Sequence, residues 1–169
     1  MEQVDILKIR ARENAKADDG NASAMSMPAS LLTFKLQNRI YAIDVTYVSE
    51  VCYIREITSI PGSPAFVSGV INLRGKIVPA ISLKNFFALE ERGLTEQNRL
   101  IILSHLDISF GIICDSISDI TTMDLTSLEN TPGNLPGRLS TYVSGIFPDN
   151  TMLIDANKLT TSPEITINK

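Results

Sequence analysis

The sequence of 169 residues has no tryptophan, one histidine and two cysteines. These few potential nitrogen and sulfur ligands do not occur at the spacing of a zinc site, so we expect neither a bound metal nor a cofactor. Six phenylalanines and four tyrosines are scattered along the chain, which disfavours a stacking platform for single-stranded nucleic acid. Acidic residues outnumber basic ones by 19 to 15, so there is no general positive field to attract nucleic acid.

Long apolar runs are also missing. Leu100–Leu103 is among the longest, and it is far too short to cross a bilayer. The first five residues lack the basic start and the apolar stretch of a signal peptide, so we expect a cytoplasmic protein without direct membrane insertion. Cys52 and Cys114 each lie inside an apolar run, which predicts buried, reduced thiols.

The most informative stretch runs from Val67 to Leu83. Two apolar, β-branched segments, Val70–Leu73 and Ile77–Leu83, flank a polar turn and predict a β-hairpin. Gly75 is suited to the positive φ angle of a short turn. Arg74 would then lie at the tip of a rigid support, where a cation loses little freedom when it binds a partner.

Further strands are predicted on both sides of this hairpin. Leu32, Phe34 and Leu36 alternate with polar residues, as in a half-buried strand. Leu100–Leu103 does not alternate, so we expect both of its faces to be buried. The other predicted strands are residues 40–44, about 51–57, 108–114, 117–122, 142–147 and 151–154. This content predicts an all-β fold of short strands, for which closed barrels leave few open edges.

Helices are expected mainly at the two ends. Apolar residues at helical spacing predict an N-terminal helix over residues 3–17, followed by a linker of small residues over 20–29. Shorter helical pieces are predicted over 45–50, 84–89 and 155–159, and a frayed tail is predicted after Ser162.

One arrangement suggests catalysis. His105 and Cys114 are expected on paired strands, so a small thiol enzyme is a rival hypothesis. Because a reactive thiolate needs partial exposure and a lowered pKa, the apolar surroundings of Cys114 favour a structural role. A ligand-binding barrel is a further alternative, since small barrels serve many functions.

The stretch Gly69–Gly75, followed by Ile77-Val78-Pro79, resembles the hallmark of CheW-type chemotaxis coupling proteins. Val48 and Glu50 are similar to the Val-x-Glu element of that family. The resemblance runs from about Ser30 to Leu159. It implies two five-stranded SH3-like β-barrel subdomains packed together, in addition to the N-terminal helix. On this basis we assign residues 1–29 to the helix and linker, and residues 30–169 to a CheW-like domain.

Within that domain we expect the first barrel over about 40–95, with contributions from the ends of the domain. We expect the second barrel over about 96–150. Two positions depart from the usual family pattern: Ser82 stands in place of an Asp, and Cys114 stands in place of a Val. These departures leave open which receptor or kinase is the partner.

The resemblance also implies a function. Proteins of this family are scaffolds without catalytic activity that couple chemoreceptors to a CheA-type histidine kinase in membrane-associated arrays. The receptor tip, an antiparallel helical hairpin, docks in an apolar groove between the barrels. The family's partner-binding positions fall on Val48, Glu50, Gly69, Asn72, Arg74 and Gly75. An alternative is a paralogue in a chemosensory system that controls pili or gliding.

Overall fold

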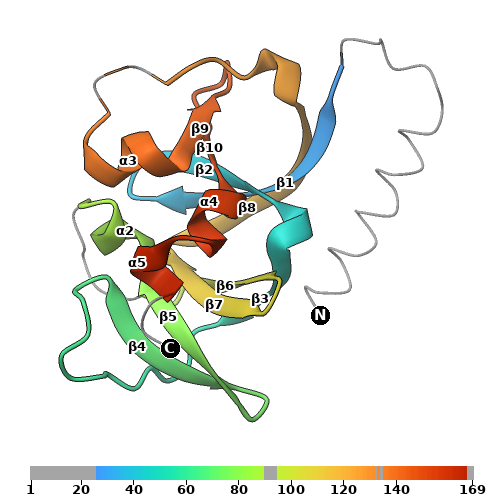
Figure 1. The fold of residues 1–169 in the computed structure, drawn as a ribbon. Helices are drawn as coiled ribbons and strands as arrows, with labels where there is room; N and C mark the ends of the chain where they lie inside the picture. Colours follow the sequence, from blue (N-terminus) through green and yellow to red (C-terminus); the bar gives the residue numbers. More distant parts are fainter. Residues whose placement is uncertain (1–25, 90–94, 132, 134, 167–169) are drawn as a thin grey trace.

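The computed structural model describes residues 26–89, 95–131, 133 and 135–166 (Figure 1). Within these ranges the chain forms ten β-strands in two five-stranded sheets, as the all-β prediction requires. The helix predicted over residues 3–17 lies outside the described residues, and so does most of the 20–29 linker.

Barrel A is the first sheet, with strand order β8-β1-β2-β10-β9. Its strands are β1 (Pro28–Leu36), β2 (Arg39–Asp44), β8 (Ser116–Asp124), β9 (Val143–Ile146) and β10 (Met152–Ile154). The chain beyond β8 returns to the opposite edge, where Glu129 forms an isolated bridge with Ile146 of β9. This bridge joins the two edges of the sheet, which leaves little of either edge open to mispairing.

Barrel B is the second sheet, with strand order β3-β6-β7-β5-β4. Its strands are β3 (Val48–Tyr53), β4 (Val67–Leu73), β5 (Lys76–Ser82), β6 (Arg99–His105) and β7 (Ile108–Cys114). The segment after β3 closes the sheet in the same way, because Thr58 and Val70 exchange two backbone hydrogen bonds of 2.9 Å. The β4–β5 hairpin extends from the end of barrel B that is farthest from barrel A (Figure 1).

The division between the barrels differs from the predicted one. Barrel B is one continuous stretch, residues 48–114, and barrel A combines strands from before and after it. A boundary near residue 95 is therefore wrong, because the β6–β7 hairpin pairs with β3 and β5. The following strand, β8, does not continue that sheet but pairs with β1.

Short helices connect these strands. They are η1 (Val45–Tyr47), α2 (Leu83–Phe86), η2 (Leu125–Ser127), α3 (Gly137–Tyr142), α4 (Ala156–Thr160) and α5 (Pro163–Thr166). The helical piece predicted over 45–50 ends at Tyr47, because the chain enters β3 at the next residue. The tail predicted to fray after Ser162 instead forms α5, in which Ile165 is buried.

The largest apolar cluster is shared by the two barrels. It takes Phe34 and Tyr41 from barrel A and Ile101 and Phe110 from barrel B. Each barrel also has a smaller cluster of its own on the other face of its strands, so strands in the middle of a sheet are buried on both faces. This explains the run Leu100–Leu103, in which every side chain is buried, and it confirms the prediction made from its missing alternation.

Polar contacts also connect the barrels. Lys84, in the helix α2 between β5 and β6 of barrel B, forms an ion pair of 2.8 Å with Asp115, at the point where the chain passes into barrel A. The backbone N–H of Gln37, in the β1–β2 turn, donates a hydrogen bond to the same carboxylate. Because Lys84 is buried, this partner is needed to offset the cost of removing its charge from water.

In the part of the chain that the structure describes, no helix combines the length and the apolar character that a membrane span needs.

The closure of barrel B depends on Gly69, and this gives a first prediction. A Cβ atom at Gly69 would lie 2.2 Å from the carbonyl oxygen of Thr58, and the φ angle of +149° already disfavours other residues. Gly69→Ala should therefore lower the free energy of unfolding by about 2–3 kcal/mol, measured by urea denaturation. Gly133→Ala is the control, since a Cβ there meets nothing within 4 Å, and it should change stability by less than about 0.5 kcal/mol. An unchanged midpoint for Gly69→Ala would contradict this account of the bridge.

Candidate functional site

The tip of the β4–β5 hairpin is a two-residue turn. Leu73 pairs with Lys76, so Arg74 and Gly75 alone form the loop. Both have positive φ angles, 53° and 85°, as the favoured hairpin turns require. The side-chain oxygen of Asn72 accepts a hydrogen bond of 2.8 Å from the backbone N–H of Gly75. The sequence-based prediction of a tight turn with a positive φ at Gly75 is therefore confirmed.

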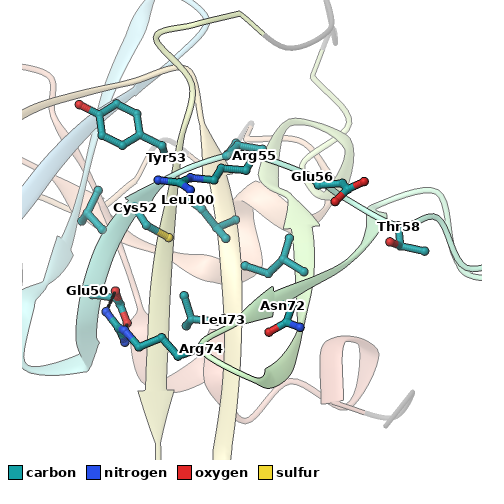
Figure 2. Close-up of a pocket in the computed structure, with 13 residues that line it drawn as sticks. Glu50, Cys52, Tyr53, Arg55, Glu56, Thr58, Asn72, Leu73, Arg74 and Leu100 are labelled. Carbon is teal, nitrogen blue, oxygen red and sulfur yellow. Dashed lines mark hydrogen bonds and ion pairs between the residues drawn. The ribbon is translucent and has the colours of Figure 1, made fainter.

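Arg74 does not extend freely into solvent from this tip. Its guanidinium turns back toward β3 and forms a bidentate ion pair with Glu50, with two N–H···O contacts of 2.7 Å (Figure 2). The hydrogen bonds that Arg74 donates to Glu50, together with the negative charge of Glu50, raise the pKa of Arg74. The two ends of the pair are unequally exposed, since the side chain of Arg74 is 68% exposed and that of Glu50 only 10%. Arg74 therefore presents a charge at the surface that a buried carboxylate holds in position.

The other predicted site residues have different surroundings. Val48 is buried in the shared core, and Gly69 lies against the backbone of Thr58. Neither reaches the surface as a contact residue would, so both help to shape barrel B. Asn72 and Gly75 form the turn that orients Arg74. The structure thus brings Glu50, Asn72, Arg74 and Gly75 together at one end of the hairpin, with Val48 and Gly69 in supporting positions.

A cavity of about 570 Å³ opens between β3 and β4, beside the ion pair (Figure 2). Its apolar part includes Cys52, Ile71 and Leu100, which belong to the small core of barrel B. Charged side chains, Arg55 and Arg74 among them, lie around its mouth. The cavity has no arrangement typical of catalysis, but it offers apolar surface and hydrogen-bonding groups to a ligand.

A second groove, of about 380 Å³, lies between barrel B and α5. Strands β4, β5 and β7 line one side, and Ile165 of α5 lines the other. Ile60 and Ile77 are exposed at this groove, Ile77 to 61%. Large apolar side chains this exposed, next to a groove, are typical of a surface that another protein covers.

The rival hypothesis of a thiol enzyme does not fit the geometry. Cys114 pairs with Arg99 and His105 pairs with Ile108, at opposite ends of the β6–β7 hairpin. Six residue steps along the hairpin separate these two pairs, which places the two side chains about 20 Å apart, at roughly 3.4 Å per residue. Burial, the largest cause, raises the pKa of Cys114 to about 12, whereas the ring of His105 packs against that of Tyr47. Among the described residues, no three His, Cys, Asp or Glu side chains group as metal ligands would.

Sequence reasoning missed several residues of these two surfaces. Arg55 falls in the strand predicted over about 51–57, but β3 ends at Tyr53, so Arg55 lies beyond the strand. Ile60 follows in a segment with no regular period, so nothing in the pattern pointed to it. Ile77 lies in an apolar run that suggested burial, but the hairpin extends beyond the core there. Glu50 did carry a signal, because a charged residue inside an apolar strand needs a partner when it is buried. A β-bulge between Val48 and Glu50 places these two side chains on opposite faces of β3, with Val48 in the shared core and Glu50 toward Arg74.

The chain matches a family model described as the CheW-like domain over residues 30–164. Among curated proteins it is similar to a chemotaxis protein CheW of Treponema pallidum, with 31% identity over 142 residues that cover 80% of this chain and 84% of the relative. It is 32% identical to the CheW of Bacillus subtilis, over 75% of this chain and 83% of the relative. A more distant similarity, 27% identity over 68% of this chain and 64% of the relative, is to protein PilI of Pseudomonas aeruginosa.

A solved structure shows the same likeness in three dimensions. The crystal structure of the scaffolding protein TtCheW from Thermoanaerobacter tengcongensis superimposes with a TM-score of 0.67 and 36% sequence identity. The alignment covers 76% of this chain and 88% of that protein.

The thiol environments predict a difference in reactivity. Cys52 is half-buried beside the cavity, whereas Cys114 is buried with a raised pKa. With a thiol reagent at pH 8, the native protein should react rapidly at one position only, and peptide mass spectrometry should identify it as Cys52. Equal labelling of Cys114 in the folded protein would contradict the burial described here.

The ion pair predicts an order of stability among variants. Arg74→Gln leaves the carboxylate of Glu50 buried without its partner, whereas Glu50→Gln leaves a mostly exposed guanidinium that water solvates. Arg74→Gln should therefore lower the thermal unfolding temperature more than Glu50→Gln. The double variant should recover part of the loss, since it contains no buried charge. Equal effects of the two single variants would show that the burial of Glu50 contributes little.

Proposed function

The chain belongs to the CheW-like domain family, whose members include chemotaxis scaffold proteins, and from this premise we propose that it is a non-catalytic adapter between chemoreceptors and a CheA-type histidine kinase. The observation that carries the proposal is the β4–β5 hairpin, where a buried carboxylate fixes an exposed arginine. Arginines held in this way are frequent anchors of protein–protein interfaces, because little freedom is lost on binding.

The other barrel supports the importance of this arginine. The β9–β10 hairpin occupies the corresponding position in barrel A, and its tip consists of Pro148, Asp149 and Asn150. Barrel A thus forms its hairpin without a cation at the tip. The fold does not require the Glu50–Arg74 pair there, which favours a role in recognition.

The groove beside α5 suits the receptor. A helical hairpin presents apolar side chains at helical spacing, and such faces bind in apolar grooves with charges at the rim. Ile60 and Ile77 supply the apolar surface here, and Lys76 and Asp107 supply charges of both signs. We assign the receptor tip to this groove and the kinase's regulatory domain to the hairpin tip.

The six predicted residues then have distinct roles. Arg74 contacts the partner, and Glu50, Asn72 and Gly75 hold it in place. Val48 packs in the shared core, and Gly69 allows the backbone contact with Thr58 that closes barrel B. Through these contacts the protein would be recruited from the cytoplasm to membrane-associated receptor arrays, where many weak contacts add in strength.

The alternative is that the protein serves as an adapter in a chemosensory system that controls pili or gliding. The similarity to PilI shows that relatives with different names share this domain. Binding to the receptor and kinase pairs of the source organism, each measured separately, would identify the system.

The experiment measures the affinity of the purified protein for a receptor cytoplasmic fragment and, separately, for the kinase's regulatory domain. The double variant Glu50→Gln/Arg74→Gln removes both charges and leaves no buried carboxylate unpaired. It should raise the Kd for the kinase domain at least about tenfold, as expected when an interface anchor is lost. Ile77→Asp should weaken binding of the receptor fragment by a similar factor, because it places a charge beside an apolar groove.

Arg39→Gln is the matched control, since it removes an exposed arginine at the β1–β2 turn of barrel A. It should leave both affinities unchanged, and all variants should show cooperative thermal unfolding. If the wild-type protein binds neither partner, the adapter function is refuted. If it binds both with affinities that no variant changes, the assigned surfaces are wrong.

A further inference from the structure

The cavity between β3 and β4 lies between two strand edges. Among the described strands of sheet B, β3 pairs with β6 and β4 pairs with β5, so β3 and β4 face each other across a gap. The backbone bridge Thr58–Val70 spans this gap at one end, and the Glu50–Arg74 ion pair spans it at the other. Beyond this bridge, residues 50–54 form one wall of the cavity and residues 71–74 form the other. Facing strand edges with a cavity between them provide backbone donors and acceptors for an additional strand.

The alternation along β4 shows which backbone groups face the cavity. Val70 directs its N–H and C=O toward Thr58, away from β5, where the residue opposite it is Pro79. Backbone groups of alternate residues point to the same side of a strand, so those of Asn72 also point away from β5 and into the gap. One donor and one acceptor are therefore aimed at the cavity, directly next to the bridge.

The side chains at the floor of the gap are apolar, whereas those at its rim are charged. The floor is apolar and consists of residues such as Ile71 and Leu100. At the rim, Arg55 extends over Leu100 toward β3, and Glu56 lies farther along the same segment near Thr58 (Figure 2). Arg55 is exposed, and within the described residues it has no ion pair. Arg74, at the opposite end, uses two of its five N–H groups for Glu50.

We propose that this gap binds an extended acidic peptide segment of a partner protein, which adds a strand between β3 and β4. In such a strand every second side chain points inward, so aliphatic residues would contact the floor. The intervening residues point outward, where acidic side chains would meet Arg55 and Arg74. The occupant is therefore a segment in which aliphatic and acidic residues alternate. The inference rests on the proposed adapter function only in that a partner would supply this segment.

The probe for the test is a capped peptide of alternating Asp and Val, seven residues long, added to the isotope-labelled full chain. Backbone amide shifts measured by NMR should change along residues 51–53 and 71–73, and the affinity should fall as salt is raised. Arg55→Gln should weaken binding at least about fivefold, because it removes one of the two rim cations. Arg39→Gln, on the other barrel, is the matched control and should have no effect. Both variants should unfold at the wild-type temperature.

Four results would overturn the proposal: no binding, shifts confined to other surfaces, equal binding of a peptide of alternating Lys and Val, or the same shifts with acetate alone. The acetate result would indicate a small-anion site. These outcomes are independent of the adapter function, because that function is measured with the receptor fragment and the kinase domain. Capture of those partners without peptide binding refutes only the added strand, and the reverse result refutes only the adapter function.

Discussion

The structure depends on strands that are buried on both faces. In the middle of each sheet, one face contributes to the core shared by the barrels and the other to a smaller cluster inside its own barrel. The two barrels consequently cannot separate without exposing residues such as Phe34 and Phe110 to water. This shared core fixes the position of the β4–β5 hairpin relative to barrel A. The groove beside α5 also keeps its shape for this reason, because its two sides come from elements packed on the same core.

The parts of the fold that depend on local chemistry could be predicted from the sequence. The Arg74–Gly75 turn follows from residue type, and the burial of Leu100–Leu103 follows from the missing alternation. Strand partners could not be predicted in this way, since nothing local tells whether β8 pairs with β7 or with β1. The sequence does contain one signal of the shared barrel architecture. Val67-Ser-Gly and Val143-Ser-Gly repeat, and each glycine lies against the residue that closes its barrel, Thr58 or Glu129.

The sequence predicted where the site lies, at the tip of the β4–β5 hairpin, but not how its side chains are arranged. The sequence predicts Arg74 at the tip of a rigid hairpin, and it lies there, but its guanidinium turns back to an ion pair with Glu50 on another strand. Such a contact joins residues 24 positions apart. It depends on the curvature of barrel B, which no local pattern encodes. The consequence is physical, since a guanidinium held by two hydrogen bonds has less freedom to lose when a partner binds than a free side chain does.

The ion pair and the strand gap beside it follow from one feature, the incomplete pairing of barrel B. Where Thr58 bridges to Val70, backbone hydrogen bonds close the sheet. Farther along the same strands no backbone pairing is available, and the Glu50–Arg74 pair connects β3 to β4 through side chains instead. Side-chain closure differs from backbone closure in one respect that matters for an adapter. It leaves N–H donors of Arg74 available for a second carboxylate, so the same guanidinium that links β3 to β4 is also able to recognise a partner.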